Sequence, residues 1–192
     1  MQNPCHLEPA DVQLLFADLQ TQIVARSKTT EPKALRLAAC VLAQLARAFS
    51  LPVTISTVPE GEDAPELIPE LAKEADGAPQ FLRTGASPFL DKKTKMALNS
   101  HGRKTLVICG FATEVVVLHA VTGAIEAGYR ALVPVDACGG MSERTEAAAL
   151  RQIEAFGGEV TSTVTMATAL APDLKTFLGQ QMFAALQQLR LA

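Results

Sequence analysis

Short runs of apolar and β-branched residues alternate with amphipathic segments, and this alternation limits the fold of the chain more than any other feature. The clearest run is TLVICG (105–110), which is apolar on both faces, as is typical of a central parallel strand. Six strands separated by helices predict a three-layer α/β/α sandwich with a six-stranded, mainly parallel sheet and a Rossmann-like arrangement. The other five predicted strands span residues 12–18, 52–58, 80–83, 131–137 and 159–164.

Helical spacing and capping residues mark the segments between these runs. Apolar residues recur every three or four positions in 32–49, and Pro32 suits the first turn of a helix there. Thr113 and Ser142 stand where they can cap two further helices. Because no linker or internal repeat interrupts the pattern, we expect one domain over residues 1–192. The other predicted helices span 67–75, 89–99, 113–127, 142–156 and 174–189.

The charge and the apolar stretches of the chain argue against two classes of partner, nucleic acids and membranes. The net charge is -3 and the basic residues are scattered, which argues against nucleic acid as a partner. The longest apolar stretch, 115–125, has about half the length that a bilayer requires, and the first residues do not resemble a secretory signal. We therefore predict a cytoplasmic protein that binds no membrane and keeps its thiols reduced. Its four widely spaced cysteines are Cys5, Cys40, Cys109 and Cys138.

The candidate site lies where the parallel strands end. In open α/β sheets, ligands bind beyond the carboxyl ends of the strands, so Asp18, Arg83, Asp136 and the turn at 110–116 are the residues of interest. The segment CGFATEVVV (109–117) passes from a buried strand into a helix N-terminus, where free backbone N–H groups can hold an anion or a developing oxyanion. On its own, the segment is equally consistent with a simple strand-to-helix connection.

Four motifs make the interpretation more specific. DLQ follows the first strand, RTGASPF the third, GFATEVV the fourth and VDACGG the fifth. In this order, and over nearly the whole chain, they resemble the isochorismatase-like cysteine hydrolases, which include nicotinamidases, carbamoylases and isochorismatases. The resemblance implies a three-layer α/β fold and a catalytic triad of aspartate, lysine and cysteine.

The residues at the triad positions depart from the family pattern. Asp18 matches the aspartate, and Gln20, in the family's D-x-Q pattern, is expected to order the loop. Arg83 stands at the lysine position, where it keeps the charge and can bind a carboxylate or carbonyl but cannot give up a proton. Val116 stands at the cysteine position, six residues after Gly110, and it cannot form a thioester. A structural salt link between Asp18 and Arg83 remains an alternative.

The resemblance also implies the walls of a pocket. In the family a cis peptide precedes the conserved threonine, which places it here between Phe111 and Ala112, before Thr113. We expect these three residues, with Gln20 and Phe89, to contact the substrate. Neither Cys109 nor Cys138 is expected to replace the missing thiol, since buried cysteines are usually inert.

The histidines bear on whether the chain holds a metal or a further site residue. His119 lies one turn beyond Val116 among Val and Ala, which is typical of a packing residue, although it could also reach the rim of the pocket. The zinc ligands of nicotinamidases have no counterpart, because no histidine lies between His6 and His101. We therefore expect neither a metal nor an organic cofactor.

Two functions remain open. The first is a small-molecule hydrolase, or an enzyme that splits a vinyl ether, in which Asp18 supplies acid catalysis in place of the thiol. The second is a catalytically silent relative that binds a small carboxylate or carbonyl compound or serves as an oligomer subunit. The apolar closing helix has more hydrophobic surface than one contact face needs, which predicts a homodimer or higher homo-oligomer.

Overall fold

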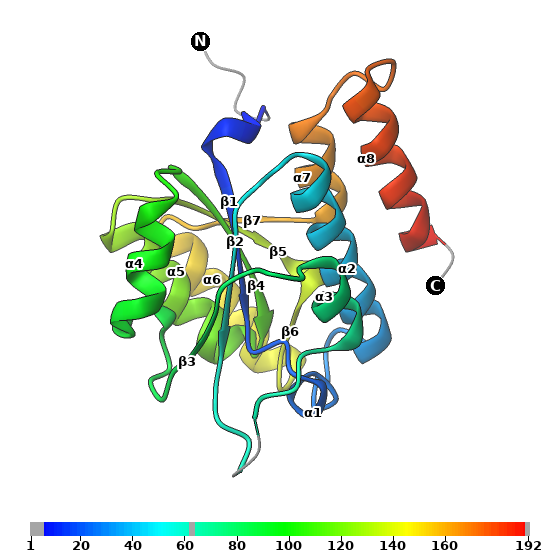
Figure 1. Ribbon diagram of the computed structural model, residues 1–192. Helices are drawn as coiled ribbons and strands as arrows, with labels where there is room; N and C mark the ends of the chain where they lie inside the picture. The colour runs from blue at the N-terminus through cyan, green and yellow to red at the C-terminus, as the bar shows by residue number, and fades with distance from the viewer. Residues whose placement is uncertain (1–5, 62–63, 191–192) are drawn as a thin grey trace.

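The computed structural model describes residues 6–61 and 64–190, and a parallel β-sheet lies at the centre of the molecule (Figure 1). Six strands follow one another in the order β3-β2-β1-β4-β5-β7, and the short strand β6 pairs with β4. All six strand pairings among the described residues are parallel. The predicted α/β class is confirmed. The strands are β1 (Val12–Ala17), β2 (Val53–Thr57), β3 (Gln80–Leu82), β4 (Thr105–Phe111), β5 (Arg130–Pro134), β6 (Cys138–Gly139) and β7 (Glu159–Thr161).

Helices cover both faces of the sheet (Figure 1). α4, α5 and α6 lie on one face, whereas α2, α3, α7 and α8 lie on the other, with α8 packed against α2 and α7. α1 lies at the edge where the strands end. The helices are α1 (Thr21–Val24), α2 (Pro32–Ala48), α3 (Pro69–Glu74), α4 (Lys92–Ser100), α5 (Leu118–Glu126), α6 (Glu143–Ala155), α7 (Thr163–Leu170) and α8 (Phe177–Gln187).

The core is centred on β1 and β4. Every residue of both strands is buried, and the strands pair in register from Val12 opposite Thr105 to Ala17 opposite Gly110. Burying an aliphatic side chain contributes about 1.5–3 kcal/mol, so these two central strands and α2 stabilise the sheet from its middle outward. α2 presents its apolar stripe to the same core, including Leu35, Leu42 and Leu45.

Several predicted boundaries were wrong, and capping explains most of them. The helix predicted from residue 89 begins at Lys92, because the Asp91 side chain accepts a hydrogen bond from Thr94 N and caps it. The strand predicted at 159–164 ends at Thr161, because Ser162 caps the unpredicted helix α7. The closing helix begins at Phe177, where Thr176 caps it.

Two further differences concern the segments around the candidate site. The strand predicted at 131–137 ends at Pro134, and Asp136 lies in a short 3-10 turn. Residues Thr113–Val117 form a π-helical turn ahead of α5, so the helix predicted from residue 113 is regular only from Leu118. The two-residue strand β6, which was not predicted, follows the 3-10 turn.

Within residues 6–61 and 64–190, the structure contains no helix whose length and apolar character would allow it to span a membrane.

Candidate functional site

Adjacent strand ends bring Asp18 and Arg83 together. Asp18 follows β1 directly, with a positive φ of 56° that aspartate tolerates better than most residues, and its N–H donates to Ser56 O at 2.9 Å. Arg83 follows β3, and its N–H donates to Thr57 O at 2.9 Å. Because β1, β2 and β3 run parallel, Asp18 and Arg83 lie beyond the same edge of the sheet.

The two side chains form a buried, bidentate ion pair. Arg83 Nη1 donates to Asp18 Oδ1 at 2.7 Å, and Arg83 Nη2 donates to Asp18 Oδ2 at 2.8 Å. Nη2 also lies 3.3 Å from Ala86 O. Asp18 is 6% exposed and Arg83 is 4% exposed, so the pair is shielded from water. Such charge-assisted, two-point contacts are strong and fix both side chains in orientation.

Opposing influences act on the proton affinity of Asp18. Burial is the largest, and it raises the pKa of the carboxyl group above its usual value. The hydrogen bonds and charge of Arg83 lower the pKa, and the nearby charge of Glu60 raises it. The net result is a raised pKa, as a group that delivers a proton requires.

Gln20 holds the loop that follows β2, as predicted. Its Nε2 donates to Val58 O at 3.0 Å and to Glu60 Oε2 at 2.6 Å, while its Oε1 accepts from Val58 N at 2.9 Å. The amide group of Gln20 therefore donates both of its hydrogen bonds to the loop that follows β2. Any contribution of Gln20 to substrate binding acts through the position of that loop.

The turn after β4 has the predicted backbone geometry. The peptide between Phe111 and Ala112 is cis, and both residues are buried. Gly110 has a φ of 154°, and a Cβ atom there would lie 1.9 Å from Ala17 O. Only glycine allows β1 and β4 to approach this closely at the site.

Two glutamates, which sequence reasoning missed, link this turn to the start of α6. Thr113 Oγ1 lies 2.7 Å from Glu146 Oε1 and 3.1 Å from Gly139 O. Glu114 Oε1 accepts from Met141 N at 2.9 Å and from Thr145 Oγ1 at 2.6 Å. The prediction that Thr113 caps a helix was wrong, because its hydroxyl makes these tertiary contacts instead.

Thiol chemistry has no support at this site. Val116 is fully buried in the core. Burial raises the pKa of Cys138 to about 12 and that of Cys109 well above its usual value. Since the thiolate is the nucleophilic form, neither cysteine is reactive near neutral pH. This agrees with the prediction that neither replaces the missing nucleophile.

Phe89 and His119 lie together in a separate groove of about 500 Å³. The Phe89 ring packs edge-on against Tyr129, with ring centroids 6.1 Å apart. His119 is exposed, so the prediction of a packing residue was wrong, although its backbone oxygen accepts a hydrogen bond from Ser87 Oγ at 3.0 Å. The reason is that this position of the helix faces outward, whereas the neighbours Val117 and Ala120 face the core.

Asp136 has a structural contact of its own. Its Oδ1 accepts a hydrogen bond from Thr163 N at 2.8 Å and so holds the start of α7. Among residues 6–61 and 64–190, no group of three histidine, cysteine, aspartate or glutamate side chains is arranged to hold a metal ion. Asp136 therefore has a structural role, and the charged side chains that meet beyond the strand ends are Asp18 and Arg83.

Comparison with known proteins shows the family to which the chain belongs. Residues 12–165 match the isochorismatase domain. The chain belongs to the isochorismatase family. Among its relatives is the probable hydrolase YcaC of Escherichia coli strain K12, which is 29% identical over 168 residues, covering 87% of this chain and 81% of the relative.

Two solved structures of YcaC proteins have the same fold. YcaC from Pseudomonas aeruginosa, solved with hexane-2,5-diol and covalent acrylamide, gives a TM-score of 0.90 at 26% identity, covering 98% of this chain and 93% of that one. YcaC from Escherichia coli, described as an octameric hydrolase of unknown specificity, gives a TM-score of 0.89 at 27% identity, covering 100% and 96%. The predicted family and fold are therefore confirmed.

Proposed function

We propose that this isochorismatase-family protein is a hydrolase that acts on a small molecule through Asp18 and Arg83, without a thioester intermediate. The observation that supports the proposal most is the buried bidentate contact between these two side chains. It combines a carboxyl group of raised pKa with a fixed cation at the edge of the sheet where α/β proteins bind ligands. The description of the Escherichia coli relative as a probable hydrolase is consistent with this activity.

In the proposed reaction, Asp18 begins in its acid form. It transfers its proton to the alkene carbon of a vinyl ether, water adds to the electron-deficient ether carbon that results, and the proton released from that water returns to Asp18. The C–O bond of the hemiketal or hemiacetal formed in this way then breaks, with its hydroxyl proton passing to the leaving oxygen, to give a carbonyl product and an alcohol. Acid catalysis of this kind suits a vinyl ether. Arg83 stays charged throughout and stabilises the carboxylate that the transfer creates.

Protonation also prepares Arg83 for substrate. A protonated carboxyl oxygen is a poorer acceptor, so one of the two N–H groups that Asp18 engages in its ionised form is released. That group can then bind a carboxylate or carbonyl on the substrate. The backbone amides of residues 111–113 are proposed to bind a carboxylate oxygen of the substrate, and Gln20 to shape the site through the loop that follows β2. Phe89 takes no part in this proposal, because it lies in the separate groove with His119.

A second candidate function is a catalytically silent protein that binds a small carboxylate or carbonyl compound. The observation that favours it is that both oxygens of Asp18 already accept hydrogen bonds from Arg83, while Val116 offers no reactive group. In that case the ion pair stabilises the fold and no turnover occurs.

Substrate panels on matched variants separate the two candidates. The purified chain is assayed against vinyl ethers, amides and carbamates, beside Asp18→Asn and the exposed control Asp173→Asn. We expect vinyl ether hydrolysis by the native chain, a loss of about 100-fold or more in Asp18→Asn, and no change in the control. Circular dichroism checks that each variant is folded.

A second arm of the experiment restores the family's usual residues. The double variant Val116→Cys with Arg83→Lys is assayed on the same amides. Amidase activity that appears only in this variant supports a native chain that does not use a thiol. A native chain that turns over no member of the panel, or an Asp18→Asn variant as active as the native chain, contradicts the proposed hydrolase.

Assembly and location complete the proposal. We propose a homo-oligomer, since the Escherichia coli relative is octameric and this chain exposes the apolar residues Leu174, Phe177, Leu178 and Phe183 in one segment. Sedimentation of the native chain as a monomer alone would overturn this.

The three free thiols among the described residues suit a reducing compartment, so the proposed location is the cytoplasm.

A further inference from the structure

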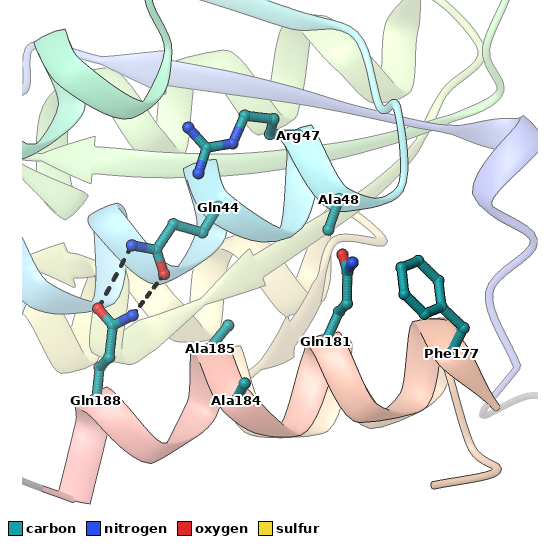
Figure 2. Close-up of a pocket in the computed structure, with 8 residues that line it drawn as sticks. All are labelled: Gln44, Arg47, Ala48, Phe177, Gln181, Ala184, Ala185 and Gln188. Atoms are coloured by element: carbon teal, nitrogen blue, oxygen red, sulfur yellow. Dashed lines mark hydrogen bonds between the residues drawn. The ribbon is translucent and has the colours of Figure 1, made fainter. Parts of the chain in front are cut away.

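A groove of about 580 Å³ separates α2 from α8 at the surface of the molecule (Figure 2). Its two ends differ. At one end Gln44 and Gln188 face each other, and at the other the Phe177 ring projects from α8 toward Ala48 (Figure 2). Between these ends the α8 wall includes the small residues Ala184 and Ala185.

Three of the four polar side chains that line the groove have partners, namely Gln44, Arg47 and Gln188. Gln188 Nε2 donates to Gln44 Oε1 at 2.9 Å, and Gln44 Nε2 lies 3.4 Å from Gln188 Oε1. Arg47, the charged residue of the groove, pairs with Glu74 at 2.9 Å. A charged or strongly polar ligand therefore finds three of these four side chains engaged.

Some apolar side chains in and just before α8 are exposed, whereas Met182 and Ala185 pack into the core. Phe177 is 72% exposed, and Leu174 and Leu178 beside it are also exposed. The helix sequence FLGQQMFAALQ contains no charged residue. A helix face without charged side chains can meet a copy of itself without the like-charge repulsion that a charged helix would suffer.

We infer that α8 packs antiparallel against α8 of a second copy, with Phe177 of each copy seated over Ala184 of the other. Phe177, Gln181 and Ala184 lie on one face of the helix, because they are spaced by four and three residues. The midpoint between 177 and 184 falls beside Gln181. A two-fold axis at that point places the large ring of each copy over the small residue of the other, as a self-complementary contact requires.

This inference rests on the proposed self-association but not on the proposed reaction. A second copy is the favoured occupant because the face is uncharged and supplies both the projecting ring and the small residue that would receive it. The octameric state of the Escherichia coli relative is consistent with assembly of such chains.

Phe177→Glu tests the surface, with Phe156→Glu as a matched control. Phe156 is 51% exposed at the end of α6, away from the groove. In sedimentation velocity we expect Phe177→Glu to convert the native assembly to species of at most half its mass, because it buries two like charges at the contact. The control should keep the native mass. A native mass in Phe177→Glu, or equal dissociation of both variants, contradicts the inferred surface.

A cross-linking measurement gives independent evidence if Phe177→Glu fails to fold. Gln181→Cys is prepared in a Cys5→Ser background, since Cys40, Cys109 and Cys138 are buried. Mild oxidation should give a disulfide-linked dimer, because each Gln181 lies beside the two-fold axis. Gln152→Cys, exposed on α6, is the control and should stay monomeric under denaturing conditions.

The outcomes distinguish two failures. A native chain that sediments as a monomer overturns self-association itself. A native oligomer in which Gln181→Cys does not cross-link, or cross-links no better than Gln152→Cys, overturns only the α8 contact.

Discussion

The ion pair at the strand ends and the groove between α2 and α8 are unusual in opposite ways, since the first buries charged side chains and the second exposes an apolar one. At the strand ends, two charged side chains are buried where apolar ones would avoid the cost of desolvation. In the groove, the large apolar side chain of Phe177 is exposed, while Gln44, Gln188 and Arg47 have partners. Buried charge and exposed apolar surface each call for an explanation that stability of the isolated fold does not supply.

The difference suggests two kinds of function. A buried acid beside a fixed cation indicates chemistry or ligand recognition. An exposed aromatic ring on a helix face without charge indicates assembly. Substitutions in the two regions should consequently have very different effects on the stability of the single chain, and the following measurements test that contrast.

The largest effect is expected from breaking the ion pair on one side. Arg83→Met leaves the Asp18 carboxylate buried without its partner, and we expect the free energy of unfolding to fall by about 3–5 kcal/mol. Urea unfolding at neutral pH measures the loss. The double variant Arg83→Met with Asp18→Asn should lose less than the sum of the single losses. An Arg83→Met chain within about 1 kcal/mol of native stability would mean that the pair is not shielded as the structure indicates.

A second large effect is expected at Gly110. The Cβ atom of Gly110→Ala would lie 1.9 Å from Ala17 O, so β1 and β4 must separate at the site. We expect a loss of about 2–4 kcal/mol from the clash and the backbone strain. Gly102→Ala is the control, since it also has a positive φ but nothing within 4 Å of the added atom. Equal losses in both variants would show that strain alone accounts for the effect.

An intermediate effect is expected where Thr113 joins the turn to α6. Thr113→Val removes the hydroxyl that faces Glu146 and Gly139, and unpaired buried acceptors cost about 1–3 kcal/mol. Thr122→Val is the control, because its hydroxyl bonds only to Leu118 O within its own helix. Thermal unfolding compares the two. If Thr113→Val is as stable as Thr122→Val, the link does not hold the turn.

The smallest effect on the single chain is expected in the groove. Phe177 is largely exposed, so Phe177→Ala should change the free energy of unfolding by no more than about 0.5 kcal/mol at concentrations where the chain is dissociated. Phe16→Ala, in the fully buried β1, should cost about 3–5 kcal/mol. A large loss in dissociated Phe177→Ala would indicate that this ring packs within its own chain.

Much of the fold could be predicted from local pattern. β1 and β4 are continuous apolar runs because both their faces are buried, and α2 has a clear helical period. The pairing of Asp18 with Arg83 could be anticipated because parallel strand ends meet at one edge of the sheet. The cis position and the role of Gln20 followed from the family resemblance.

The rest depended on contacts between distant segments. The β-branched residues at 159–164 look like one strand, but Ser162 and the distant Asp136 give α7 its start. β6 has only two residues and exists because it pairs with the end of β4. The contact of Thr113 with Glu146 joins residues 33 positions apart, and no periodicity in the sequence signals it.

The pH dependence of vinyl ether hydrolysis tests the central claim most directly. If Asp18 acts as the acid, the rate is highest where Asp18 is protonated and falls as pH rises through its raised pKa, a range above that of an ordinary aspartate. We expect this falling limb in the native chain and its disappearance, with most of the activity, in Asp18→Asn. A rate that is absent from the native chain, or a profile that Asp18→Asn leaves unchanged, would contradict the assignment.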